Sequence, residues 1–353
     1  MRPRLVFLCL AATLLLTACL GSTQHPAGEY EAPVSTAVTA DGWTLALQHY
    51  GAAPRPGAPV VVLVPDLYEN GRVFALDEKH NLAERLAAHD LGVVVAELRG
   101  QGLSEKPAWW NDRRADWTFE AHVRQDLPAI VAVVKERYAG RKIVLAGHGL
   151  GGLACFAYAT AAPEEIAALA GWGVADGFGP LNELHRALLA RVDHLAFLGA
   201  APTHKGATAP APFIGTRESL FDVLLCNGRN LARPTVKRYY RLALEPMSIG
   251  VARQAAQWAE RNEWTSHDGR IDYRAGLPSL TCPVLLLSGG QDNLFPAVAS
   301  REMLDRIGSA NKRHRVFDRA SRYGDDYGHA GLLIGEEAGD EVGEYFRQWV
   351  ESL

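Results

Sequence analysis

Residues 143–152 read IVLAGHGLGG, and this short stretch indicates the class of fold. Its first four residues form an apolar, branched run that is typical of a strand buried on both faces. Glycine then recurs at Gly147, Gly149 and Gly151, and a helix of small residues is expected over 150–160. Glycine is needed where a tight turn brings backbone segments together, because a Cβ would clash there. The stretch therefore predicts a sharp turn between a central strand and a helix.

Strand and helix patterns alternate in both directions from this turn, after a hairpin at Asp41-Gly42. Apolar strands between amphipathic helices predict an α/β fold, with a mostly parallel sheet flanked by helices. We expect one domain over 34–353. The alternation stops over about 173–278, where we expect a cap insertion above the edge at which such sheets bind ligands. The expected strands are 34–40, 43–50, 60–64, 92–97, 142–146, 166–172, 283–288 and 314–317, and the expected helices are 76–89, 119–138, 150–160, 296–307 and 335–351.

The composition is that of a folded globular protein. Of 353 residues, 48% are hydrophobic and 22% are charged, which excludes a disordered chain. The net charge of −4 gives no support for nucleic-acid binding. Beyond the first twenty residues the cysteines are Cys155, Cys226 and Cys282, and none has CxxC spacing. We therefore expect no metal site and no disulfide framework. We also expect no cofactor.

The N-terminus has the features of a secretory signal over residues 1–18. Two arginines precede an apolar run that is too short to span a membrane as a helix. The sequence Leu16-Thr17-Ala18-Cys19 resembles a bacterial lipobox, which implies that Cys19 is lipidated, and residues 19–33 are expected to form a tether. We expect a lipid-anchored protein on the periplasmic side of a bacterial envelope, in the outer rather than the inner membrane because Leu20 is not Asp. The alternative is an ordinary signal peptide with an incidental cysteine.

The turn at Gly149 resembles the G-x-S-x-G nucleophile elbow of the α/β-hydrolase superfamily, with glycine in place of the serine. Residues 98–104, LRGQGLS, resemble the family's D-x-R-G-x-G-x-S turn, with Glu97 in place of the aspartate. Other stretches resemble a lipase and esterase branch that is related to polyhydroxyalkanoate synthases; they are 116–119, 126–129, 273–275 and 327–329. The resemblance covers about 34–353.

The resemblance implies a role for each of five residues. Asp292 stands where the family has its triad acid, and His329 stands where it has its triad base. Gly149 occupies the nucleophile position. The backbone N–H groups of Leu67 and Leu150 are the expected oxyanion-hole donors.

The residue at the nucleophile position limits the chemistry. Gly149 has no side chain, so no acyl-enzyme can form there. We expect the adjacent His148 to point away from the cleft and Cys155 to lie in the core, which leaves no replacement nucleophile. Asp66 has two interpretations: a carboxylate that opposes an oxyanion, or a turn residue that points to solvent.

Two interpretations remain open for Asp292 and His329. The pair holds two loops together as a residual clamp, or it activates a water molecule for hydrolysis. Asp176 is a reserve acid position in the family and is expected at the surface. Five tryptophans either line an apolar cleft or fill the core; they are Trp109, Trp110, Trp117, Trp258 and Trp264.

These observations support three functional hypotheses. The first is a lipid-anchored hydrolase homologue that lacks the elbow nucleophile and binds an apolar or acyl molecule, or a protein partner, without covalent catalysis. The second is an esterase-like or lipase-like hydrolase of carboxylic esters in which Asp292 and His329 activate water. The third is a purely structural envelope lipoprotein.

Overall fold

The computed structural model describes residues 32–51, 54–108, 111–177, 200–201 and 229–353. The expected signal, Cys19 and most of the expected tether lie outside the described residues, as does most of the first half of the expected cap. Within the described part of the chain, no helix has the length and apolar character needed to cross a membrane.

The centre of the molecule is a mixed, mostly parallel sheet of eight strands in the order β1-β2-β4-β3-β5-β6-β9-β10. The pairs β1–β2 and β2–β4 are antiparallel, and all other neighbours are parallel. The α/β fold class is therefore confirmed. The strands are β1 (Val34–Val38), β2 (Thr44–Tyr50), β3 (Val60–Val64), β4 (Gly92–Glu97), β5 (Ile143–His148), β6 (Ala168–Trp172), β9 (Val284–Gly289) and β10 (Lys312–Phe317), and β7 (Ala200–Ala201) pairs with β8 (Met247–Ser248) apart from the sheet.

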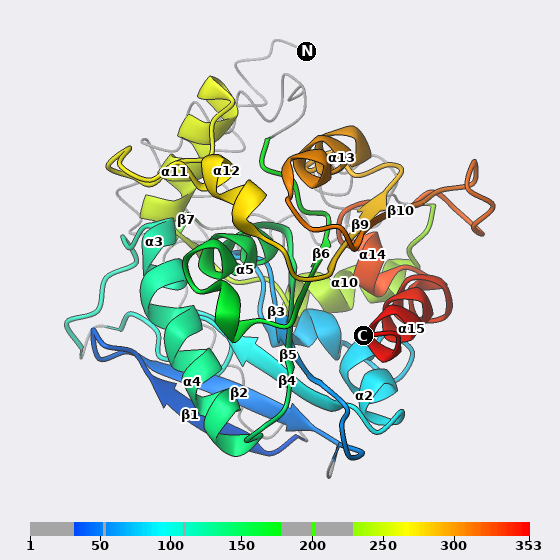
Figure 1. The fold of residues 1–353 in the computed structure, drawn as a ribbon, viewed down its shortest axis with the longest axis horizontal. Coiled ribbons are helices and arrows are strands. Elements are labelled where there is room, and N and C mark those ends of the chain that lie inside the picture. The colour runs from blue at the N-terminus through cyan, green and yellow to red at the C-terminus, as the bar shows by residue number, and fades with distance from the viewer. Residues whose placement is uncertain (1–31, 52–53, 109–110, 178–199, 202–228) are drawn as a thin grey trace.

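Helices cover both faces of this sheet, with α4 and α5 on one face and α2 and α15 on the other (Figure 1). Every residue of the central strands β3 and β5 is buried, because each strand lies between two helical layers. The α-helices are α2 (Leu82–Ala87), α3 (Phe119–Ala121), α4 (Leu127–Arg137), α5 (Gly149–Ala161), α10 (Arg233–Leu242), α11 (Ile249–Arg261), α12 (Tyr273–Gly276), α13 (Ala297–Arg306), α14 (Gly331–Ile334) and α15 (Glu344–Glu351). Short 3-10 turns lie at 71–74, 163–165 and 277–279, and π-helical turns lie at 122–126 and 339–343.

The expected and observed elements differ mainly before α2. The expected helix 76–89 begins only at Leu82, because Asn81 caps it by accepting a hydrogen bond from the N–H of Glu84 at 3.0 Å. The residues before the cap form a turn in which Asp77 accepts from the backbone N–H of His80 at 2.9 Å. The other expected elements agree with the structure apart from a few residues at their ends.

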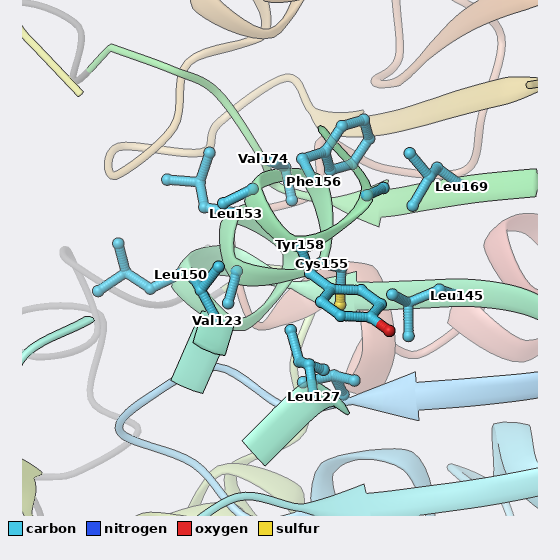
Figure 2. Packing of buried hydrophobic residues seen from close by; sticks show 14 of the residues in the cluster. Val123, Leu127, Leu145, Leu150, Leu153, Cys155, Phe156, Tyr158, Leu169 and Val174 are labelled. Atoms are coloured by element: carbon cyan, nitrogen blue, oxygen red, sulfur yellow. The ribbon is translucent and has the colours of Figure 1, made fainter. Parts of the chain in front are cut away.

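The helix after the glycine-rich turn, α5, is deeply buried. In α5, all residues from Gly149 to Ala159 are buried. Figure 2 shows Leu153, Cys155 and Phe156 of this helix among apolar side chains that include Leu145 of β5 and Leu169 of β6. Cys155 is a core residue, as expected, and burial raises the pKa of its thiol. The glycine-rich turn is therefore held between a buried strand and a buried helix.

Candidate active site

The turn between β5 and α5 is as sharp as its glycines indicate. Gly149 has a φ of +51°, a backbone conformation that glycine adopts without strain. A Cβ on Gly147 would lie 2.6 Å from the Cα of Gly152, and one on Gly151 would lie 1.8 Å from the carbonyl oxygen of Pro65. The loop after β3 therefore packs directly against the first turn of α5.

The side chain of Asp66 fills the space beside Gly149. A Cβ on Gly149 would lie 1.6 Å from Oδ2 of Asp66 and 3.0 Å from Nε2 of His329. The Asp66 side chain has no solvent-exposed surface. The interpretation of Asp66 as a turn residue that points to solvent is therefore wrong, because its carboxylate occupies the volume that a side chain at position 149 would need.

Asp66 also engages both expected oxyanion donors. Its Oδ1 accepts hydrogen bonds from the backbone N–H of Leu67 at 2.6 Å and of Leu150 at 3.2 Å. Its backbone oxygen accepts from Nε2 of Gln101 at 2.8 Å and from the N–H of Glu69 at 2.9 Å, which fixes the loop. The N–H groups of Leu67 and Leu150 thus converge on one oxygen, which belongs to a carboxylate of the same chain.

His329 lies between two carboxylates. Its Nδ1 is 2.8 Å from Oδ2 of Asp292, and its Nε2 is 3.2 Å from Oδ2 of Asp66. Oδ1 of Asp292 accepts from the backbone N–H groups of Leu294 and Phe295, each at 2.9 Å, which orients the acid. The structure thus brings Asp292, His329 and Gly149 together, and it adds Asp66.

The two carboxyl groups raise the pKa of the histidine between them. Burial alone would lower the pKa of His329, but the carboxylates of Asp292 and Asp66 outweigh that effect and raise the pKa to about 10. Burial raises the pKa of Asp66, and the imidazolium of His329 opposes that rise. Both ring nitrogens of His329 face carboxyl oxygens, an arrangement that favours the protonated ring.

The backbone at Gly173 lies close to the pair of Asp292 and His329. Gly173, at the end of β6, has a φ of +55°. A Cβ at this position would lie 2.7 Å from both Oδ2 of Asp292 and Nδ1 of His329. A glycine at this position therefore permits the contact between the acid and the histidine.

A second buried network lies behind the site. The ring of His148 stacks on that of His329, with centroids 4.2 Å apart. Nδ1 of His148 is 2.8 Å from Oε2 of Glu69, and the hydroxyl of Tyr239 donates to Oε1 of Glu69. Burial would raise the pKa of Glu69, but His148, together with Tyr239 and His329, outweighs burial and lowers it. His148 therefore packs against His329 on the side of this second network. Glu69 and Tyr239 were not predicted as site residues, because no spacing in the sequence links them to the site.

Three of these side chains are close enough together to be considered for a metal ion. Asp66, His148 and His329 each offer a ligand atom, and these atoms lie within 4.8 Å of one another. However, the planes of the two histidine rings are only 25° apart, and Nε2 of His148 faces the backbone oxygen of His329 at 3.3 Å. The two nitrogen lone pairs do not converge on one point, so this arrangement does not fit an ion.

Asp176 is buried, contrary to the expectation of a surface position. Its carboxylate contacts Nε of Arg274 at 3.0 Å and Nη1 of Arg306 at 3.2 Å. Burial raises its pKa, and the two arginines oppose the rise. Asp176 thus joins α12 to α13, and its contacts serve packing between these elements.

The tryptophans that the structure describes pack into the fold. Trp258 and Trp264 are both 1% exposed and belong to the apolar core. Trp117 packs edge-on against Trp43, with ring centroids 5.2 Å apart. Trp109 and Trp110 lie outside the described residues. The cleft-lining interpretation is therefore wrong for Trp258 and Trp264, which are core residues.

Glu97, at the end of β4, anchors the neighbouring turns. Its Oε1 accepts from Nε2 of Gln48 at 3.1 Å and from the N–H of Gly71 at 3.2 Å, and its Oε2 accepts from the N–H of Leu103. Burial, reinforced by the nearby carboxylate of Glu245, raises the pKa of Glu97 to about 7. Glu97 is thus a further buried carboxylate with an altered pKa.

Comparison with known proteins identifies the fold family. A family model described as the alpha/beta hydrolase fold matches residues 59–324. The chain belongs to the α/β-hydrolase fold family. The site residues follow the carboxyl ends of parallel strands: Asp66 after β3, Gly149 after β5, Asp292 after β9 and His329 after β10.

Individual relatives are distant. Lipase LipV of Mycobacterium tuberculosis is 29% identical over 154 residues, which are 43% of this chain and 50% of that protein. The chain thus spans about half the length of this curated relative. A thermophilic esterase from Thermogutta terrifontis is 22% identical with a TM-score of 0.62, and covers 91% of this chain and 99% of its own. A monoacylglycerol lipase of Paleococcus ferrophilus is 22% identical with a TM-score of 0.60, over 87% and 98%. At these identities the solved structures support the fold.

Proposed function

We propose that the protein is a hydrolase that works without an acyl-serine intermediate and uses His329, oriented by Asp292, for proton transfer. The observation that carries the proposal is the continuous set of contacts from Asp292 through His329 to Asp66. Covalent and general-base hydrolases share this arrangement, in which an acid orients a base and the base lies within hydrogen-bond distance of a third reactive group. The similarity to esterases and lipases agrees with hydrolysis as the reaction class.

The geometry argues against the ordinary ester mechanism of this fold. Gly149 supplies no oxygen that could attack a carbonyl. In addition, the N–H groups of Leu67 and Leu150 donate to Asp66, so a substrate carbonyl would have to displace a buried carboxylate before these groups could stabilise an oxyanion. The water-activation hypothesis for carboxylic esters meets the same obstacle. Hydrolysis at this site therefore requires a mechanism that includes Asp66.

A second candidate function is a binding protein without turnover. The observation that favours it is burial, because the side chains of Asp66 and His329 have no exposed surface. In that case the Asp66 carboxylate permanently fills the space beside Gly149. An apolar or acyl molecule, or a protein partner, would bind elsewhere at this edge of the sheet.

Variants at His329 distinguish these two functions. We expect hydrolysis of at least one of two probes, p-nitrophenyl butyrate or 1-bromobutane. The assay measures the nitrophenol or the bromide that is released. His329→Gln should abolish that turnover. His80→Gln is the matched control, because His80 is also buried and lies 2.8 Å from an aspartate, Asp77, away from the site. Absence of turnover with both probes, or equal turnover in His329→Gln, would refute the hydrolase proposal and favour the binding function.

We also propose that Cys19 carries a lipid that anchors the protein to the outer membrane on its periplasmic side. The support is the sequence Leu16-Thr17-Ala18-Cys19 and the tether over 19–33. Detergent should be needed to release the wild-type protein from membranes, whereas Cys19→Ser should leave the precursor unlipidated. The N-terminal peptide of the wild-type protein should be heavier than that of Cys19→Ser by the mass of the lipid. A mass difference that equals only the exchange of sulfur for oxygen would contradict lipidation.

A further inference from the structure

We propose that Asp66 is the covalent nucleophile of the site, and that its substrates carry a leaving group on a saturated carbon. This inference rests on the proposed hydrolase function and names the residue and substrate class for it. It assigns the nucleophile to the loop after β3, in place of the turn after β5. Carboxylates act as nucleophiles in other hydrolytic enzymes, so the residue type suits the role.

The two oxygens of Asp66 have different surroundings. Oδ1 is held by the N–H groups of Leu67 and Leu150. Oδ2 lies against the vacant side of Gly149, where a Cβ would be only 1.6 Å away, and it faces Nε2 of His329. One oxygen is therefore fixed by the backbone, while the other lies where an attacking oxygen on residue 149 would be.

The first step would transfer an alkyl group to the protein. Oδ2 of Asp66 attacks the saturated carbon, a new C–O bond forms, and the bond to the leaving group breaks, so that the leaving group departs with the electron pair. The result is an alkyl ester on Asp66. A halide leaves as a stable anion and needs no proton, which makes a primary alkyl bromide the simplest probe.

The second step would hydrolyse this ester with the same residues. Esterification removes the negative charge of Asp66, so His329 loses one of the two carboxylates that stabilise its imidazolium. Nε2 can then release its proton to solvent, where it accompanies the departed halide, and act as a base. His329 then takes a proton from water, and the hydroxide attacks Cγ of Asp66. The C–O bond to the alkyl oxygen breaks, and the alcohol leaves with the proton held by His329. Asp66 is then a carboxylic acid with one oxygen from water, and its proton passes to Nε2 of His329, which restores the carboxylate and the imidazolium.

The hydrogen bonds to Oδ1 would have a role in the second step. During the second step Oδ1 becomes the oxyanion of a tetrahedral intermediate, and the N–H groups of Leu67 and Leu150 already point at it. Attack of Asp66 on a carboxylic ester would instead need donors for the substrate's carbonyl oxygen, and these two are taken. Displacement at a saturated carbon forms no oxyanion on the substrate. The geometry therefore favours alkyl over acyl substrates.

Trapping the alkyl ester tests the inference. His329→Gln keeps a polar side chain beside Asp66 but removes the base, so the ester should accumulate. After incubation with 1-bromobutane, peptide mass spectrometry should find a butyl group on Asp66 of His329→Gln, and none at this peptide in Asp66→Asn. The exposed Asp268 serves as an internal reference for unassisted alkylation. Alkylation of Asp66 that is no faster than that of Asp268 would overturn the inference.

Labelled water separates failure of this inference from failure of the proposed function. Wild-type protein that turns over 1-bromobutane in H₂¹⁸O should incorporate ¹⁸O into the Asp66 peptide, and protein without substrate should not. Bromide release that depends on His329 but leaves Asp66 unlabelled would refute the nucleophile role and leave the hydrolase proposal standing. Ester turnover that depends on His329, with neither bromide release nor a butyl adduct, would refute the substrate class and the nucleophile role together.

Discussion

Restoring a serine at position 149 provides a strong test of the geometry of Asp66. A serine Cβ would lie 1.6 Å from Oδ2 of Asp66, whereas non-bonded atoms of this size prefer about 3.5 Å. The carboxylate would have to move by about 2 Å, which breaks its contacts with Leu67, Leu150 and His329. We therefore expect Gly149→Ser to be destabilised and inactive toward esters, although it contains all three residue types of a hydrolase triad.

The expected loss follows from the contacts that would be broken. Breaking a buried ion pair by displacing one partner costs about 3–5 kcal/mol of unfolding free energy. The φ of +51° at position 149 adds about 1–3 kcal/mol of strain for a residue with a side chain. The double variant Asp66→Ala/Gly149→Ser removes the obstructing carboxylate and frees both N–H groups, so it should relieve the steric clash, although it still lacks the ion pair between Asp66 and His329. It should also hydrolyse p-nitrophenyl butyrate at least about 10³-fold faster than Gly149→Ser.

Denaturation by urea, followed by tryptophan fluorescence, gives the unfolding free energies, and labelling by a fluorophosphonate reports a reactive serine. Asp66→Ala alone is the control for loss of the carboxylate without a serine, and it should remain unlabelled. If Gly149→Ser is as stable as the wild type and reacts with the fluorophosphonate as fast as the double variant, Asp66 does not occupy the position described here.

Three further predictions concern buried charges and close contacts. The pKa of about 7 for Glu97 exceeds its unfolded value of 4.5, so the folded state binds more protons than the unfolded state. The free energy of unfolding should therefore fall by about 3 kcal/mol as pH rises from 4.5 to 7. Urea titrations at several pH values should show a smaller fall in Glu97→Gln. The stabilisation that the imidazolium of His329 contributes should be fully present below pH 6.5 and lost as pH rises to about 10. Nitrogen NMR of the His329 ring should give a lower pKa in Asp66→Asn than in the wild type. An unchanged pKa would show that Asp66 does not contact the ring. Gly173→Ala places a Cβ 2.7 Å from both Asp292 and His329, so it should reduce kcat through their separation, and a kcat equal to that of the wild type would contradict the role of this glycine.

The sequence predicted the fold well because its signals are local and repeated. Apolar strands such as 60–64 and 92–97 coincide with β3 and β4, and the glycines after β5 indicate the turn correctly. The expected helix 76–89 was too long because apolar spacing continued through a segment that the Asn81 cap excludes from the helix. Hydrophobic spacing does not register a cap of this kind.

The site was predictable in part. The strand order brings Gly149, Asp292 and His329 to one edge of the sheet, and their positions in the sequence indicated as much. The rotamer of Asp66 could not be predicted, because a turn aspartate and a buried counter-ion look alike in a sequence. Its position depends on the absence of a side chain on Gly149, which lies 83 residues further along the chain but in direct contact with the carboxylate.

A crystal structure of the protein would test the central claim most directly, because the position of the Asp66 carboxylate is visible in electron density. The account predicts Oδ1 between the backbone nitrogens of Leu67 and Leu150, and Oδ2 beside Gly149 and against Nε2 of His329. Density that shows the Asp66 side chain turned away, with water beside those two nitrogens, would contradict it.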